Sequence, residues 1–414
     1  MAAVRANNVQ QTRQLLENHP ELKSQLNEPM SCLPFDSVVL SVAVHSRNRE
    51  IIDLLLHAGA DINARSGWWA GGFGVLDSCQ PEFAPFLIER GAVVDAHAAA
   101  RLGMLSRLQE LVSENPELVH ARGGDGQTPL HFASTVEIAR YLLDHGADID
   151  ALDVDHESTP AQYMARDRQE VARYLVVRGA RTDILMAAAL GDVPLVRKHL
   201  EADPSCIRMS VSEEFFPKQN PRAGGTIYVW TLGQHKTPHL VARDFGHEEI
   251  FGLLMERSPD EVKLTQACEL GDEAALRTLL ASHRDLAKTL AESDRRRLVH
   301  AAQNNNTNAV RLMLEAGWPV DVRGQHGGTA LHWAAFHGNA AMAELILEHN
   351  PPLELLDSDF NATPLGWATH GSEHGWCCKT GDYAGTVEAL LKAGAKPLEK
   401  IEGSETVRAV LQRK

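Results

Sequence analysis

Hydrophobic residues recur along the chain in short runs at helical spacing, and a glycine-containing turn follows each run. Apolar residues at positions i, i+3 and i+4 share one face of an α-helix. Val196 and Leu200 have that spacing in one segment, and Leu276, Leu279 and Leu280 have it in another. The pattern therefore predicts an all-α protein made of short amphipathic helices.

The helices are predicted to form repeated pairs, because one motif returns along the sequence. Residues 127–150 read QTPLHFASTVEIARYLLDHGADID, and residues 328–350 read GTALHWAAFHGNAAMAELILEHN. From Thr329 to Thr363 is 34 positions. A fixed period of this length is typical of a repeat array whose units are helix-turn-helix pairs. Regular and degenerate copies together predict about twelve units over nearly the whole chain.

Each part of the motif has a mechanical role. Thr128 and Thr329 are suited to cap a helix start, and Pro129 or Pro364 fits the first helical turn, where its missing N–H costs nothing. Small residues such as Ala334 allow neighbouring helices to approach closely. Glycines are expected to end the second helices with a positive φ. These glycines are Gly59, Gly91, Gly146, Gly179, Gly317 and Gly394.

The sequence resembles the ankyrin-repeat family over essentially all 414 residues, with motifs at 128–131 (TPLH), 329–332 (TALH) and 363–365 (TPL). Its last three units resemble those of long bacterial ankyrin proteins. The resemblance implies a curved solenoid with short β-turn or hairpin arms, whose concave face binds a protein partner and is usually not catalytic. It also implies that the motif histidines His131 and His332 tie neighbouring turns together.

A single solenoid is expected over residues 1–414, closed by a short amphipathic capping helix within residues 398–414. The chain opens inside a half-repeat, which raises the suspicion that the natural protein starts before Met1. A first departure from the repeat, Gly67–Gly74, holds two tryptophans. It forms either a stacking surface or a locally repacked core, and the core is favoured.

Two longer insertions interrupt the array. Residues 209–235 are too long for a repeat turn, and the β-branched alternation of residues 226–231 predicts a strand arm or β-hairpin that is either a binding element or a flap. Residues 366–383 add ten positions between two paired helices and gather tryptophan, histidine and carboxylate side chains. The candidate ligand-binding residues are Tyr228, Trp230, His332, Trp333, Trp367, Trp376 and Tyr383.

The second of these insertions also carries groups suited to acid–base chemistry. Glu373 and Asp382 would be the paired carboxylates of a hydrolase, with His370 and His374 tuning them. Glycoside hydrolysis needs two carboxylates about 5–10 Å apart. A metal site is disfavoured, because no C-x-x-C or H-E-x-x-H motif is present and glycines at 371 and 375 weaken a helix. No metal or cofactor is therefore predicted.

Two function classes follow. The leading hypothesis is a non-enzymatic scaffold that presents its concave face to a protein partner. The alternative is a hydrolytic enzyme acting on a small polar or carbohydrate substrate, with a pocket between the 209–235 arm and the 366–383 loop. The absence of a specific catalytic motif favours the scaffold.

Charge and cysteine content narrow the partners and the compartment. Acidic residues outnumber basic ones by 55 to 40, which gives a formal net charge of -15 and disfavours nucleic acid as a partner. Six cysteines do not make a disulfide framework, so a reducing compartment is favoured. Because no stretch approaches the roughly 18 apolar residues of a spanning helix, we expect a cytoplasmic monomer without membrane contact.

Overall fold

The computed structural model of the protein describes residues 1–413. The chain forms two compact units, Met1–Ile250 and Phe251–Lys414. Every regular element in residues 1–413 is helical and none is a strand, which confirms the all-α prediction. Among the same residues, no helix combines the length and apolar character needed to cross a bilayer.

The first unit consists of short helices that follow one another in pairs. They are α1 (Ala2–Arg5), α2 (Val9–Asn18), α3 (Val39–His45), α4 (Arg49–His57), α5 (Val75–Ser78), α6 (Ala84–Ile88), α7 (Ala96–Arg101), α8 (Leu105–Glu114), α9 (Pro129–Phe132), α10 (Val136–Asp144), α11 (Pro160–Tyr163), α12 (Gln169–Val177), α13 (Ile184–Leu190), α14 (Val193–Ala202), α15 (Pro238–Asp244) and α16 (Glu248–Arg257), whose last residues belong to the second unit.

The second unit continues the same pattern and ends on a single amphipathic helix. Its helices are α17 (Asp260–Leu270), α18 (Glu273–Ser282), α19 (Glu292–Arg295), α20 (Arg297–Gln303), α21 (Thr307–Glu315), α22 (Ala330–His337), α23 (Ala340–Leu347), α24 (Pro364–His374), α25 (Tyr383–Lys392) and α26 (Glu405–Gln412). Short 3-10 turns connect the pairs in both units, at η1 (Pro20–Gln25), η2 (Pro34–Asp36), η3 (Pro81–Phe83), η4 (Pro116–His120), η5 (Gly124–Gly126), η6 (Pro204–Arg208), η8 (Leu286–Thr289) and η9 (Gln325–Gly327).

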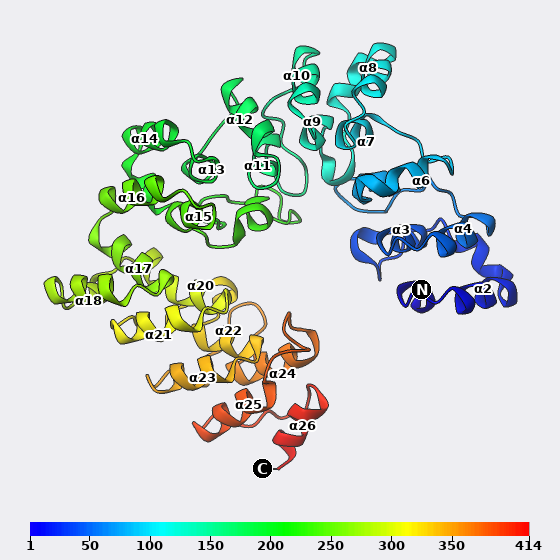
Figure 1. The fold of residues 1–414 in the computed structure, drawn as a ribbon. Helices are drawn as coiled ribbons and strands as arrows, with labels where there is room; N and C mark the ends of the chain where they lie inside the picture. The colour runs from blue at the N-terminus through cyan, green and yellow to red at the C-terminus, as the bar shows by residue number, and fades with distance from the viewer. Residues whose placement is uncertain (414) are drawn as a thin grey trace. The chain divides into compact units, whose positions relative to one another are not determined.

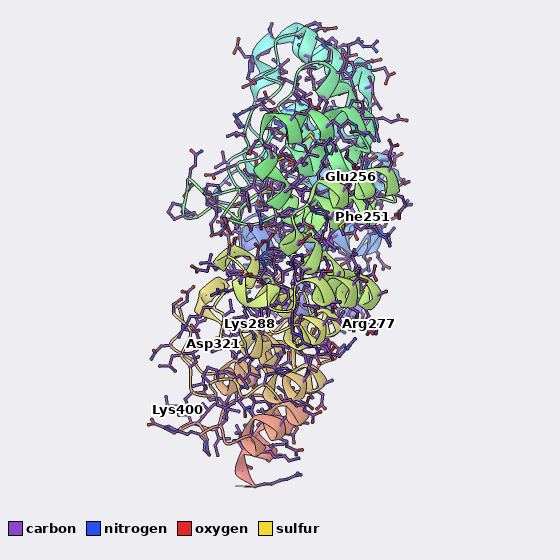
Figure 2. All side chains as sticks on the ribbon, turned by 90° about the vertical axis from the view of Figure 1, so that its left-hand side faces the viewer. Phe251, Glu256, Arg277, Lys288, Asp321 and Lys400 are labelled. Carbon is purple, nitrogen blue, oxygen red and sulfur yellow. The ribbon has the colours of Figure 1, made fainter. Side chains whose placement is uncertain are left out.

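Within the second unit, first helices stack on first helices and second helices on second helices. Helices α20, α22 and α24 form one layer, and α21, α23 and α25 form the other (Figure 1). Helix α26 packs on α25 and buries Val407, Val410 and Leu411. Charged side chains such as Arg277, Lys288 and Lys400 are exposed (Figure 2). The core therefore runs as a continuous apolar layer between the two rows of helices.

Local capping explains where these helices begin and end. Thr363 caps α24 by accepting a hydrogen bond from the Gly366 N–H, and Asp382 caps α25 in the same way. All six glycines predicted to end second helices have a positive φ, between 93° and 106°. A residue with a Cβ would be strained there. The helix boundaries were therefore predictable from local chemistry.

The predicted strand arm at residues 226–231 was wrong. The segment forms a π-helical turn, η7 (Val229–Gly233), preceded by Tyr228 in the α region. Its backbone groups pair locally, since the N–H groups of Trp230 and Thr231 both donate to the Ile227 carbonyl at 2.9 and 3.0 Å. An isolated hairpin would leave such groups unpaired on its edges. Burial of Tyr228 and local hydrogen bonding therefore override the β-branched composition.

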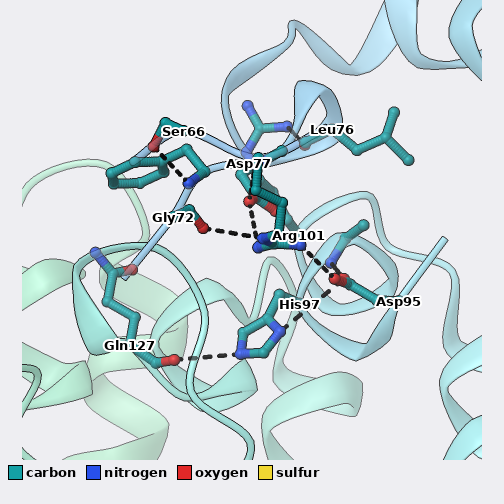
Figure 3. Close-up of polar contacts among 12 residues, drawn as sticks. Ser66, Gly72, Leu76, Asp77, Asp95, His97, Arg101 and Gln127 are labelled. Atoms are coloured by element: carbon teal, nitrogen blue, oxygen red, sulfur yellow. Dashed lines mark hydrogen bonds and ion pairs between the residues drawn. The ribbon is translucent and has the colours of Figure 1, made fainter. Parts of the chain in front are cut away.

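A network of polar contacts holds the irregular segment Gly67–Gly74 in place within the first unit (Figure 3). The Arg65 guanidinium donates to the Gly72 carbonyl at 3.0 Å and to Asp77 at 2.9 Å. Asp77 is buried, and desolvation raises the pKa of its carboxyl. Trp68 meets the ring of Phe35 edge-on, with centroids 5.2 Å apart. Trp68 is half-buried and Phe35 is 47% exposed, so the choice between a repacked core and a stacking surface stays a prediction.

The third departure extends a helix, which its glycines were expected to weaken. Helix α24 continues through Gly371 to His374 because its backbone packs closely against the end of α22. A Cβ at Gly371 would lie 2.4 Å from the Phe336 carbonyl oxygen. The Tyr383 hydroxyl donates to that same oxygen at 2.9 Å. The glycine therefore permits a close helix contact here and does not end the helix.

Candidate functional site

The extended helix α24 and the preceding repeat enclose an aromatic pocket of about 400 Å³ in the second unit. Trp333 of α22 and Trp367 of α24 are 3% and 6% exposed, and their rings meet edge-on with centroids 5.1 Å apart. Trp376 is 67% exposed and stacks on Trp333 at 6.0 Å. The pocket is lined by His326, Trp333, Phe336, Phe360, Ala362, Gly366, Trp367, His370 and Trp376.

Hydrogen bonds fix one buried tryptophan of this pocket and leave the other unpaired. The Trp367 indole N–H donates to the Asp357 carboxylate at 2.8 Å. Although burial opposes it, hydrogen bonds from Trp367 and from backbone N–H groups hold the pKa of Asp357 below its usual value. In contrast, the Trp333 indole N–H is buried and meets no acceptor among the described residues. An unpaired buried donor costs free energy, so the packing around Trp333 has to offset that loss.

Two projecting turns complete the pocket, and sequence reasoning missed both contributions. His326 comes from η9, and its Nδ1 lies 2.7 Å from Asp359 in the next turn. Phe360 follows in that turn, is 64% exposed and packs near Trp367 with centroids 6.2 Å apart. A fixed repeat period places the equivalent turns of consecutive units next to one another. Aromatic residues and histidines at equivalent turn positions could therefore have identified the rim of the pocket from the sequence.

The predicted ligand-binding residue His332 has a structural role and does not line the pocket. Its Nδ1 accepts a hydrogen bond from the Thr329 N–H at 3.1 Å, so Nε2 carries the proton. Nε2–H donates to the carbonyls of Leu355 and Ala362 at 3.1 and 3.3 Å. Burial lowers the pKa of His332 to about 4, which keeps the ring neutral near pH 7. The motif histidine thus ties two turns together, as the family resemblance implied.

Of the four candidate catalytic residues, only His370 lines the aromatic pocket. His370, Glu373 and His374 together line a second cavity, of about 470 Å³, beside residues 398–403, so His370 borders both cavities. Glu373 lies 3.6 Å from Arg408 and 3.9 Å from His374. Asp382 accepts the Gly385 N–H at 2.8 Å as the cap of α25 and lines neither cavity.

The other predicted ligand-binding residues also divide between core and surface. Tyr383 is buried, and desolvation raises the pKa of its hydroxyl to about 12. Tyr228, in the first unit, is fully buried and donates to Asp183 at 3.0 Å. Trp230 is 75% exposed on the same unit. The structure therefore brings Trp333, Trp367 and Trp376 together around one pocket.

Comparison with protein families identifies the repeats. A family model described as ankyrin repeats in three copies matches residues 96–185, 264–357 and 298–401. A model for a single ankyrin repeat matches residues 38–67. The matched segments include the α22–α24 region that forms the aromatic pocket.

Several curated proteins are similar to parts of the chain. The chain is 32% identical over 100 residues to palmitoyltransferase Hip14 of Drosophila melanogaster, which is 24% of this chain and 14% of the relative. It is 25% identical over 362 residues to the ankyrin repeat domain-containing protein SAT10 of Stachybotrys chartarum, which is 75% of this chain and 18% of the relative. It is 32% identical over 108 residues to the E3 ubiquitin-protein ligase XB3 of Oryza sativa subsp. japonica, or 26% of this chain and 24% of the relative. The chain thus spans less than a quarter of the length of each of these relatives.

Proposed function

Because this chain belongs to the ankyrin-repeat family, whose repeats imply a protein-interaction scaffold, we propose that it captures an apolar side chain of a protein partner in the aromatic pocket. The partner would lie on the face formed by the projecting turns and first helices, which corresponds to the concave face predicted from the sequence. The pocket between Trp333, Trp367 and Trp376 is the observation that carries the proposal.

The chemistry of the pocket supports an apolar anchor. Its walls are mostly aromatic, and its volume falls within the range of about 300–1,000 Å³ typical of ligand sites. Trp376 and Phe360 expose large apolar rings at the rim, and exposed aromatic residues of this kind often carry most of the energy of a protein interface.

A hydrolase has less support than a scaffold. The two candidate carboxylates have separate structural contacts, since Asp382 caps α25 and Glu373 lies beside Arg408. A paired acid and base would have to act on one substrate in one cavity. The arrangement of these groups therefore favours binding over turnover.

A cytoplasmic location remains part of the proposal. All six cysteines lie within residues 1–413, and all are free thiols. Free thiols are typical of a reducing compartment.

Selection of peptides on the full-length chain tests the pocket. A phage-displayed random peptide library should yield binders that share one large apolar residue. Their affinity should fall by about tenfold or more in Trp376→Ala, because loss of an aromatic contact residue at an interface commonly costs more than 1 kcal/mol. Fluorescence anisotropy of the labelled peptides would give the dissociation constants.

Trp230→Ala is the matched control, because it removes a similarly exposed tryptophan, at 75% against 67% for Trp376, from the first unit. Peptide affinity should be unchanged in this variant. Equal loss in both variants, or no loss in Trp376→Ala, would remove the pocket as the binding site while leaving a scaffold that uses another surface.

A further inference from the structure

Three metal-ligating side chains meet at the projecting turns of the first unit, far in sequence from the aromatic pocket. Asp125 lies in η5, and Asp155 and His156 lie in the corresponding turn of the next repeat. One ligand atom from each residue lies within 4.8 Å of the others. The turns are joined by backbone hydrogen bonds, since the Val154 N–H donates to the Asp125 carbonyl at 2.8 Å. The cluster is therefore set by the packing of consecutive repeats.

Asp125 is held in the protein interior with an unsatisfied carboxylate oxygen. It is 8% exposed, and its Oδ1 has no hydrogen-bond partner in the part of the chain that the structure describes. Oδ2 meets only the Gln127 amide, at 3.5 Å. The Trp68 indole N–H lies near this carboxylate. It too is buried, and it makes no hydrogen bond of normal geometry to a described residue. Such an oxygen is costly unless a ligand satisfies it.

Close packing on both sides causes this burial. A Cβ at Gly71 would lie 2.2 Å from the Gly123 carbonyl oxygen, and one at Gly126 would lie 2.3 Å from the Val154 side chain. The turn of Asp125 is thus enclosed between the Gly67–Gly74 segment and the next repeat. Burial removes the Asp125 carboxylate from water, and the carboxylates of Asp155 and Asp153 add negative charge near it. A bound cation would relieve both effects.

His156 is oriented as metal-binding histidines usually are. Its Nδ1 lies 2.8 Å from the Gly225 carbonyl, which can only accept, so Nδ1 carries a proton and Nε2 is the nitrogen that can ligate a metal. Nε2 lies 3.7 Å from Asp155 Oδ2. A backbone carbonyl that holds the non-ligating nitrogen is a common outer contact of metal-bound histidine. The 209–235 insertion supplies this carbonyl.

The third carboxylate near this cluster, that of Asp153, already accepts hydrogen bonds within the turn. The Asp153 carboxylate accepts hydrogen bonds from the N–H groups of His156 and Ser158 and from the Tyr163 hydroxyl. It therefore holds the shape of the turn, whereas Asp125 Oδ1 and His156 Nε2 keep the capacity to bind an ion.

We propose that Asp125, Asp155 and His156 bind a divalent transition-metal ion, with Zn²⁺ as the best match, and that this ion fastens the 209–235 insertion to the repeat turns. One imidazole and two carboxylates form a neutral site with such an ion and favour Zn²⁺ over Ca²⁺ or Mg²⁺, which prefer oxygen ligands alone. Zinc bonds are about 2.0–2.2 Å long, so the three ligand atoms must lie closer together than the 4.8 Å limit within which they now lie. Side-chain movements of about 1 Å would bring them to bonding distance.

Zinc binding to the full-length chain tests the proposal. Competition with a chromophoric chelator, together with elemental analysis after gel filtration, should show about one tightly bound Zn²⁺ per chain. Asp125→Asn and His156→Gln should each weaken this binding more than tenfold and abolish the rise in Tm that Zn²⁺ causes in the unchanged protein. Circular dichroism would establish that both variants remain folded.

Asp359→Asn is the matched control, because it removes a carboxylate from the equivalent turn of the second unit, where Phe360 replaces the histidine. It should bind Zn²⁺ like the unchanged chain. Zinc affinity that is insensitive to both Asp125→Asn and His156→Gln would overturn the proposal, as would Ca²⁺ binding that matches or exceeds Zn²⁺ binding. If both variants misfold, protection of His156 from diethyl pyrocarbonate by Zn²⁺ in the unchanged chain decides the question, and absence of protection overturns the site.

Discussion

The indole of Trp376 stacks on that of Trp333, with centroids 6.0 Å apart and an angle of 28° between their planes. The two residues have different environments, because Trp333 is in the core and Trp376 is mostly exposed. One belongs to a regular repeat helix and the other to the turn after the extended helix α24. Their contact joins the insertion to the repeat array.

This difference predicts unequal effects on stability. Trp333→Ala should lower the free energy of unfolding by about 3–5 kcal/mol, because it empties a large core position. Trp376→Ala should cost about 1 kcal/mol or less, since it removes only a stacking contact at the surface. Urea unfolding followed by circular dichroism measures both values. Equal costs would show that Trp376 is part of the core.

Alanine substitutions at two helical glycines, Gly371 and Gly252, should change the stability of the protein in opposite directions. Gly371→Ala should destabilise the protein by about 1–3 kcal/mol, because the new Cβ meets the Phe336 carbonyl and must push α24 from α22. Gly252→Ala, in α16, should stabilise it by about 0.5–1 kcal/mol, because the added carbon meets no described atom within 4 Å beyond its chain neighbours and the adjacent backbone of its own helix. Thermal unfolding of the two variants compares them. A stabilising Gly371→Ala would contradict the close contact.

His332 predicts a pH dependence of stability. Its pKa in the folded protein, about 4, is below the ordinary value of about 6.5, so the unfolded chain takes up the proton first as pH falls. The stabilising contribution is complete above about pH 6.5 and is lost as pH drops toward 4, by up to about 1.4 kcal/mol per pH unit. Urea unfolding between pH 7 and pH 4 measures this slope.

His332→Gln should reduce that slope while keeping the cap. The chain already uses glutamine at the equivalent position, where Gln162 Oε1 accepts the Thr159 N–H at 2.8 Å. His349→Gln, which changes an exposed histidine, is the control and should leave the slope unchanged. An unaltered slope in His332→Gln would assign the acid sensitivity to other groups, among them the buried His131.

Local chemistry made much of the fold predictable. The Thr-x-x-His caps, the amphipathic spacing and the terminal glycines act within a few residues of one another, so the helix pairs and the all-α class followed from the sequence. Trp333, Trp367 and Trp376 were candidates for another reason, because the 366–383 insertion and the repeat before it gather tryptophan, histidine and carboxylate side chains. Their burial and mutual contacts were not predictable from the sequence.

Contacts between distant segments decided the rest. The β-branched run at 226–231 does not form a strand because Tyr228 is buried against Asp183, and α24 passes through Gly371 because the Phe336 carbonyl lies beside it. The cluster of Asp125, Asp155 and His156 exists only because turns from consecutive repeats pack together. The sequence by itself determined the repeating helices, since short-range capping and periodicity encode them. Tertiary packing determined the sites, since their side chains come from segments that only the folded chain brings within contact distance.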